Sequence, residues 1–199
     1  GGIRPADFNF LQGLRKICNR EGILLIFDEV QCGMGRTGKV FAYQTYGVVP
    51  DIVTLAKGLG GGIPIGAMLA SEKAASGFAP GDHASTFGGN PLVTAVANQV
   101  MDIITEEGFL EQVTKMGDYL VRSLQAINDS RLVEVRGRGL MLGIEFNQDI
   151  KNLVNICMQK GLLVLGAGNR VLRMVPPLTI NETEVNQAVN LLKEALKEW

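Results

Sequence analysis

Apolar residues recur along the chain with two different spacings, and these predict alternating helices and strands. Residues 5–20 carry apolar side chains at helical spacing, and Pro5 suits the first turn of a helix. Residues 23–27 are uniformly apolar, which is typical of a strand in the centre of a parallel sheet. A similar run at 52–56 and an apolar stretch at 65–70 continue the series. The first half therefore predicts an α/β fold built on a mostly parallel sheet.

The second half reads as a smaller α+β unit with shorter strands. Its apolar periodicity predicts helices over 91–104, 109–127, 152–160 and 182–199, and strands over 132–135, 140–146, 162–165 and 171–175. Asn181 or Thr179 is a candidate cap for the last helix. A boundary near residues 106–108 gives two predicted domains, 1–107 and 108–199.

Composition narrows the class of protein. With 199 residues, 46% of them hydrophobic, the chain can bury a substantial core. A formal net charge of −1 with mixed signs argues against nucleic-acid or anionic-membrane partners. No apolar run is long enough to span a bilayer, so we expect a cytoplasmic protein. Three widely spaced cysteines favour reduced thiols over a disulfide framework, and no metal site is expected.

Lys57 is the first candidate for chemistry, because it ends the apolar run 52–56 and opens a glycine-rich turn. An ammonium group surrounded by apolar atoms loses hydration, and its neutral amine then becomes available for nucleophilic attack. The glycines at 58 and 60–62 allow close approach of a flat ligand. The alternative is a lysine whose charged end simply reaches solvent from the strand end.

A nucleotide-binding interpretation competes for the segment Gly33–Lys39, GMGRTGK. It satisfies G-x-G-x-x-G and nearly matches a phosphate-binding P-loop, with Val40 where Ser or Thr is needed. A P-loop must open a full helix, yet Gly47 and Pro50 follow closely. A nucleotide hydrolase is therefore the weaker hypothesis, and a non-enzymatic dimerisation or binding module is the other alternative.

Asp28 and Lys57 each follow an apolar strand, at the sheet edge where ligands bind in open α/β folds. A buried carboxylate facing a buried amine across one crevice suits pyridoxal 5′-phosphate (PLP). The aldehyde of PLP needs a lysine, and its pyridine nitrogen needs a carboxylate partner to stay protonated.

Five ordered segments carry a resemblance to a known family. They are LLIFDEVQCGMGRTGKVFA, PDIVTLAKGLGGGIPIGAML, DHASTFGGNPL, VRGRGLMLGIEF and LRMVPPLTI, and they cover nearly the whole chain. Together they resemble the class III, or ornithine-type, PLP-dependent aminotransferases of fold type I. The resemblance is strongest to members that transfer the amino group of N-acetylornithine to 2-oxoglutarate in arginine biosynthesis. Members acting on ornithine, succinyldiaminopimelate, succinylornithine or 4-aminobutyrate remain alternatives.

The resemblance implies roles for a cofactor-binding set in the first half. Lys57 would bind the cofactor aldehyde and then act as the base that moves the substrate proton. Asp28 would pair with the pyridinium nitrogen, and Glu29 belongs to the same stretch. Val30 would pack on the ring face, and Gln31 would reach the phenolic oxygen.

The resemblance also implies a homodimer and a substrate-binding pair. Thr86 would bind the cofactor phosphate of the neighbouring subunit, while Ser85 would contact substrate. Arg173 would grip the substrate carboxylate with its planar fork. Alternatively, Ser85 and Thr86 make local turn bonds and Arg173 is a solvated strand residue. His83, the only histidine, is more simply structural.

The family's phosphate-binding loop and ring-stacking aromatic have no counterpart in this sequence. We therefore expect the chain to correspond to the C-terminal half of a family member, comprising the latter part of the large domain and the small domain. By itself it is expected to be inactive.

Overall fold

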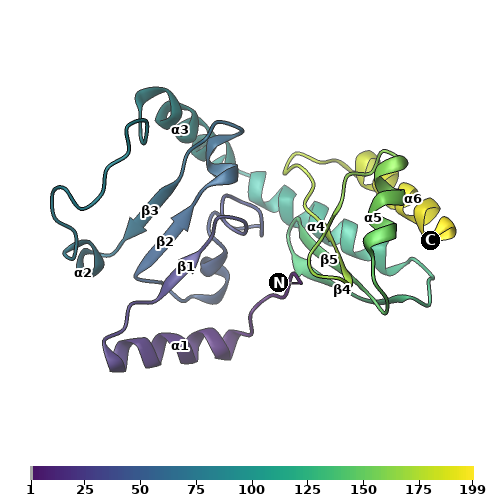
Figure 1. Cartoon of the computed structure of the whole chain (residues 1–199), viewed down its shortest axis with the longest axis horizontal. Coiled ribbons are helices and arrows are strands. Elements are labelled where there is room, and N and C mark those ends of the chain that lie inside the picture. The colour runs from purple at the N-terminus through teal and green to yellow at the C-terminus, as the bar shows by residue number, and fades with distance from the viewer. Residues whose placement is uncertain (1) are drawn as a thin grey trace. The chain divides into compact units, whose positions relative to one another are not determined.

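The computed structural model describes residues 2–199 and contains two compact units (Figure 1). The first unit comprises residues 6–110, and the second comprises residues 2–5 together with 111–199. Whether these units correspond to the large and small domains of a PLP enzyme stays a prediction. Among the described residues, no helix combines the length and the apolar character needed to cross a membrane.

The first unit is built around a three-stranded sheet with the order β1-β2-β3. β1 (Ile26–Asp28) pairs with β2 (Ile52–Leu55) in parallel, whereas β2 pairs with β3 (Ala67–Ala70) antiparallel. The prediction of a mostly parallel sheet is therefore too simple, and the sheet is mixed. A parallel return would need a long crossover, but only the short 3-10 turn η2 (Lys57–Gly60) lies between β2 and β3. The remaining elements are α1 (Phe8–Glu21), η1 (Ala42–Tyr46), α2 (Glu72–Ala75) and α3 (Pro91–Thr105).

Helix α1 begins at Phe8, later than the predicted start at Pro5. Asp7 caps it, since the Asp7 side chain accepts a hydrogen bond from the Phe10 N–H at 3.0 Å. The helix ends at Gly22, whose φ of 68° closes the last turn. Its buried side chains, with Leu25 and Val48, form a small apolar cluster under the sheet.

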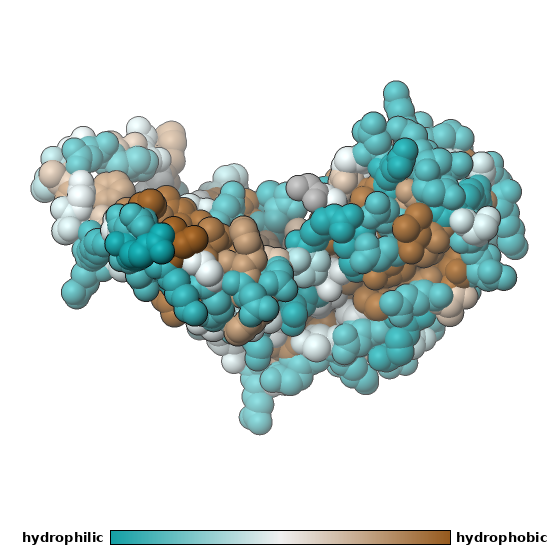
Figure 2. Space-filling view, turned by 90° about the horizontal axis from the view of Figure 1, so that it is seen from below, coloured by the Kyte–Doolittle hydropathy of each residue, from teal (hydrophilic) through white to brown (hydrophobic). Residues whose placement is uncertain are grey.

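Strand β1 differs from the prediction of a fully buried central strand. It spans three residues and lies at the edge of the described sheet. Ile23, Leu24 and Ile26 are 56%, 38% and 55% exposed. The apolar run is therefore only half covered, by α1 on one side. Figure 2 shows brown hydrophobic side chains at the surface of the part of the chain that carries α1 and β1.

The second unit is an antiparallel sheet with the order β4-β5-β7-β6 and three helices. Its elements are α4 (Phe109–Gln125), β4 (Leu132–Arg138), β5 (Met141–Phe146), α5 (Lys151–Gln159), β6 (Leu165–Gly166), β7 (Val171–Met174) and α6 (Glu182–Glu198). Strand alternation divides the sheet into two faces. Leu142, Ile144 and Phe146 on β5 are buried and belong to the core. So do four residues on one face of α4: Val113, Met116, Leu120 and Leu124.

Two local features fix this unit. Gly117 on α4 lies against the β4–β5 hairpin so closely that a Cβ there would be 2.3 Å from the Gly139 carbonyl oxygen. At the start of α6, Asn181 accepts a hydrogen bond from the Glu184 N–H, and the Glu184 carboxylate accepts one from the Asn181 N–H. Asn181 is thus the cap, as one of the two predicted candidates. The strand predicted over 162–165 is wrong in extent, because β6 has only two residues.

Candidate active site

Asp28 and Lys57 come to the same edge of the first unit's sheet. Strands β1 and β2 are parallel neighbours in which Asp28 pairs with Thr54, and Lys57 follows the end of β2. The carboxyl ends of parallel strands meet at one edge, so both side chains belong to the edge at which α/β folds bind ligands. This part of the sequence prediction is confirmed by the register.

Their surroundings differ from the prediction of a buried pair. Both Asp28 and Lys57 are exposed in the described chain. The physical reason is that β1 is an edge strand and both residues lie at strand ends, where few atoms of this chain surround them. Asp28 is nevertheless oriented, because its Oδ1 accepts a hydrogen bond from the Val30 N–H at 3.0 Å.

The backbone around Lys57 is strained. Lys57 has φ 50° and Met34 has φ 54°, and both are non-glycine residues in the left-handed region. They come from the loops that follow β2 and β1, and a Cβ on Gly58 would lie 3.4 Å from the Met34 Cβ. Such conformations cost about 1–3 kcal/mol each and occur where the surrounding structure enforces them, often at functional sites.

Glu29 is buried, in contrast to its neighbour Asp28, and only 3% of it is exposed. Its two carboxylate oxygens accept hydrogen bonds from the N–H groups of Ala42 (2.7 Å) and Tyr43 (2.8 Å) at the start of η1. Burial raises the pKa of this carboxyl, while the bonds from Tyr43 and Ala42 oppose the rise. Glu29 therefore ties the end of β1 to η1, and its predicted cofactor contact stays a prediction.

Val30 and Gln31, the two further residues predicted to contact the cofactor ring, follow Glu29. Val30 is half-buried and Gln31 is exposed, and both lie close in sequence to Asp28. Cys32 follows, and burial together with the negative charge of Glu29 raises the pKa of its thiol to about 11. That thiol stays protonated at neutral pH and is a poor nucleophile.

The glycine-rich segment 33–38 is a compact turn rather than a phosphate loop. Gly35 donates to the Val40 carbonyl at 3.2 Å and Gly38 to the Gly35 carbonyl at 3.0 Å, so these N–H groups are used within the turn. The element that follows is the five-residue 3-10 helix η1, without the long helix N-terminus that a bound phosphate needs. This supports the sequence argument against a nucleotide hydrolase.

Ser85 and Thr86 lie in the exposed loop before α3. The Ser85 hydroxyl accepts a hydrogen bond from the Gly88 N–H at 3.1 Å, which is the local turn bond considered as an alternative role. Thr86 is exposed, as is His83. Asn90 ends the loop by capping α3 through the N–H groups of Leu92 and Val93. The loop is thus shaped locally, with the Thr86 hydroxyl at its surface.

Arg173 belongs to the second unit, on β7, where it pairs with Gly143 of β5 and Leu165 of β6. It is half-buried, and it borders a mainly apolar groove of about 560 Å³. Residues of α5, β6, α6 and the Val175–Pro177 segment complete the lining. A guanidinium beside an apolar wall is suited to a carboxylate.

Comparison with known proteins decides the family. The sequence model of the class III aminotransferase family matches residues 1–196 of this chain. The chain belongs to this family. Class III aminotransferases use PLP, and the family membership expected from the sequence segments is confirmed.

Individual relatives agree with the family. The chain is 49% identical over 201 residues to acetylornithine aminotransferase of Caldanaerobacter subterraneus, covering 100% of this chain and 51% of that protein. It is 50% identical to the acetylornithine aminotransferase of Nostoc sp., and the match covers 98% of this chain and 47% of that protein. The chain thus spans about half the length of the curated relatives that it matches.

Solved structures show the same likeness. N-acetylornithine aminotransferase from Stenotrophomonas maltophilia matches with a TM-score of 0.90 and 41% identity, over 100% of this chain and 53% of that one. Ornithine delta-aminotransferase of Plasmodium falciparum matches with a TM-score of 0.90 and 33% identity, over 99% and 53%. The described units therefore have the fold found in PLP enzymes of fold type I.

The residues at the sheet edge fit PLP in their chemistry. An exposed lysine amine can reach an aldehyde, and a carboxylate fixed by the Val30 N–H can face a pyridine nitrogen. The backbone at Lys57 is strained, as is often found at functional sites, and Gly62 behind it has no atom within 4 Å of a Cβ position. Sequence reasoning missed the capping role of Glu29 and the contact between Met34 and Gly58. Strand alternation could have indicated the first, because neighbours on a strand face opposite ways.

Proposed function

We propose that this chain is part of a PLP-dependent aminotransferase that transfers the amino group of N-acetylornithine to 2-oxoglutarate, as in arginine biosynthesis. The observation that carries the proposal is the Asp28–Lys57 pair at one sheet edge, in a chain similar to acetylornithine aminotransferases over its whole length. PLP, when bound, supplies an electron sink for the amino-acid carbon. The proposed divisions are a large-domain part over residues 1–107 and a small domain over 108–199.

The chain's own residues then perform distinct tasks. The Nζ of Lys57 would hold the cofactor, and its amine would move the proton at the substrate carbon. The Asp28 carboxylate would keep the ring nitrogen protonated through its negative charge. Val30 would limit movement of the ring, and Gln31 would donate to its phenolic oxygen. Glu29 shapes this segment through its bonds to η1.

Substrate binding and assembly complete the proposal. Arg173 binds the carboxylate that donor and acceptor share, with two parallel N–H bonds. Ser85 contacts substrate, and the exposed Thr86 reaches the cofactor phosphate of the partner in a homodimer. A cytoplasmic location is proposed, in keeping with reduced thiols at Cys18, Cys32 and Cys157.

The proposal is tested by trapping the cofactor on the full-length protein that contains this chain. Borohydride reduction after PLP loading should attach the cofactor to Lys57, detected by peptide mass mapping. Lys57→Arg should abolish the label, whereas Lys39→Arg, which changes another exposed lysine, should retain it. Label on Lys39 or Lys73 in the unchanged protein would contradict the assignment.

The amino donor is a separate question. Structural neighbours include ornithine aminotransferases, so ornithine is the second candidate. Succinyldiaminopimelate, succinylornithine and 4-aminobutyrate are the further donors to compare. We expect kcat/KM to be highest for N-acetylornithine when all five are assayed with 2-oxoglutarate. A higher kcat/KM for ornithine would make ornithine the amino donor and leave the family unchanged.

A further inference from the structure

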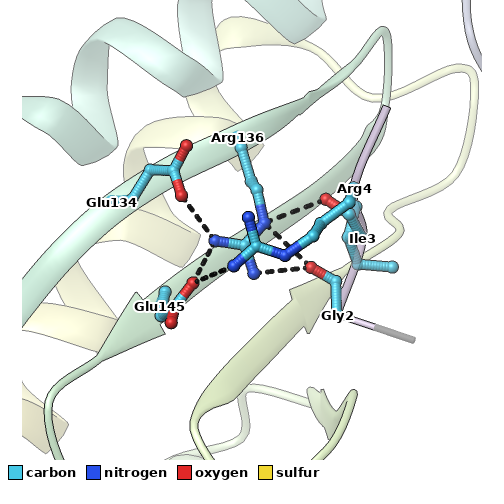
Figure 3. Close-up of polar contacts among 6 residues, drawn as sticks. All are labelled: Gly2, Ile3, Arg4, Glu134, Arg136 and Glu145. Atoms are coloured by element: carbon cyan, nitrogen blue, oxygen red, sulfur yellow. Dashed lines mark hydrogen bonds and ion pairs between the residues drawn. The ribbon is translucent and has the colours of Figure 1, made fainter. Parts of the chain in front are cut away.

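Arg136 is the buried centre of a polar cluster in the second unit, whose other charged side chains are partly or largely exposed (Figure 3). Its side chain is 7% exposed, and it donates to Glu134 at 2.7 Å and to Glu145. Arg4 also binds Glu145, at 3.0 Å. Two arginines and two glutamates balance in charge, so the cluster offers little attraction to a further anion.

Arg136 also donates hydrogen bonds to the backbone of Gly2 and Ile3. Its Nε donates to the Gly2 carbonyl at 2.9 Å and to the Ile3 carbonyl at 3.1 Å, while its Nη2 donates to the Gly2 carbonyl at 2.7 Å. These carbonyls flank Ile3, a β-branched residue with φ 51°. Such a backbone is strained and needs external support. The guanidinium supplies that support, as the dashed lines of Figure 3 show.

The segment held by Arg136 lies on the same sheet face as Arg173. Arg136 pairs with Gly143, and Gly143 pairs with Arg173, so the three residues form one row across β4, β5 and β7. Directly opposite residues of antiparallel strands share a face. Ile3 lies over the middle of the row, because a Cβ on Gly143 would be 2.9 Å from the Ile3 Cβ.

The contact extends to Val171, the residue before Arg173 on the same face of β7. A Cβ on Gly143 would lie 3.0 Å from a Val171 methyl, and one on Gly2 would lie 3.9 Å from the other Val171 methyl. Val171 is buried, and the Nε of Arg173 is buried too. Gly2 and Ile3 therefore cover the sheet between Arg136 and Val171, on the face that also carries Arg173.

We propose that Arg136 is a positioning residue for the substrate carboxylate at Arg173, acting through the segment Gly2–Arg4 that it holds over Gly143. This rests on the carboxylate role proposed for Arg173. The segment limits the space on that face and the directions available to the Arg173 guanidinium. Releasing it lets the guanidinium turn, and a two-point carboxylate contact is sensitive to that loss of direction.

The test measures carboxylate binding by the full-length protein, with glutarate as an unreactive probe in calorimetry and with KM and kcat for 2-oxoglutarate. Arg136→Lys keeps the charge and loses the fork. We expect its glutarate Kd and its KM to rise about tenfold, with kcat within about threefold of the unchanged protein. Arg131→Lys is the matched control, since Arg131 binds Asp129 and the Leu196 carbonyl in the same unit without touching residues 2–4. Its Kd should change less than twofold.

A second variant covers the case in which Arg136→Lys does not fold. In Gly143→Ala the new Cβ would be 2.9 Å from the Ile3 Cβ, so the substitution should displace Ile3 and raise the glutarate Kd. An unchanged Kd in Arg136→Lys or, failing that variant, in Gly143→Ala overturns the proposal, provided that Arg173→Lys weakens glutarate. If Arg173→Lys also leaves the Kd unchanged, the carboxylate role of Arg173 itself is wrong.

Discussion

Replacing Glu29 by glutamine tests whether the end of β1 is held by its buried carboxylate. Both oxygens accept backbone N–H bonds from η1, and each bond to a charged acceptor stabilises the fold by about 1.5–3 kcal/mol. An amide keeps one accepting oxygen and turns its NH₂ group toward the second N–H. The expected loss is therefore one bond and one buried donor left unsatisfied, about 2–3 kcal/mol.

Hydrogen exchange measures this loss where it occurs. A change of about 2–3 kcal/mol corresponds to a fall of roughly 30- to 150-fold in protection of the Ala42 and Tyr43 amides. Glu21→Gln is the control, because Glu21 is exposed and its carboxylate binds the exposed Arg20 side chain. Protection within about threefold of the unchanged protein would refute the reasoning.

The pH dependence gives the same experiment a second readout. Burial raises the pKa of Glu29 in the folded state, so the folded protein holds this proton more tightly than the unfolded chain. The stability linked to that proton is present below the unfolded pKa and is lost as pH rises through the folded pKa. Glu29→Gln should remove this dependence, which denaturant titrations between acid and neutral pH would detect.

Three further predictions concern single side chains. The hydrogen bond from the Leu25 N–H and then that from Arg15 lower the pKa of Asp51 in the folded state. The stability that the Asp51 carboxylate contributes is therefore present above its unfolded pKa and is lost as pH falls through its folded pKa. Asp51→Asn should lower the free energy of unfolding by about 1–2 kcal/mol at pH 7 and by less in acid, as measured by denaturant titration. Asp28→Asn should retain folding by circular dichroism but lose about a hundredfold or more in turnover, and near-normal turnover would remove Asp28 from the site. Arg173→Lys should raise KM for donor and acceptor while cofactor absorbance is unchanged, and an unaltered KM would contradict its role.

The sequence predicted the elements that depend on local signals. The helices at α3, α4 and α6 follow their apolar periodicity, and Asn181 caps α6 as its residue type suggested. The edge that joins Asp28 and Lys57 also followed from two apolar runs in one α/β series. These features depend on short-range patterns that a single chain carries in full.

Other features depend on long-range contacts and could not be predicted. The uniformly apolar run 23–27 indicated burial on both faces, but burial requires neighbours, and β1 is an edge strand here. The antiparallel direction of β3 follows from the path of η2 rather than from composition. Likewise, Arg136 and Ile3 are far apart in the sequence, so their bond is visible only in the structure.

The open edge of β1 leads to a prediction about the chain itself. The exposed Ile23 precedes β1 and the exposed Ile26 lies in it. β1 is an edge strand of the described sheet, and such surfaces associate with other strands or aggregate. Asp28 and Lys57 are exposed at the same edge, without an enclosure that excludes water from the reacting groups. We therefore expect the 199-residue chain alone to show no significant transamination when PLP, N-acetylornithine and 2-oxoglutarate are supplied and glutamate is followed. The full-length protein is the positive control, and turnover by the isolated chain comparable to that control would mean that these residues need no further enclosure to act.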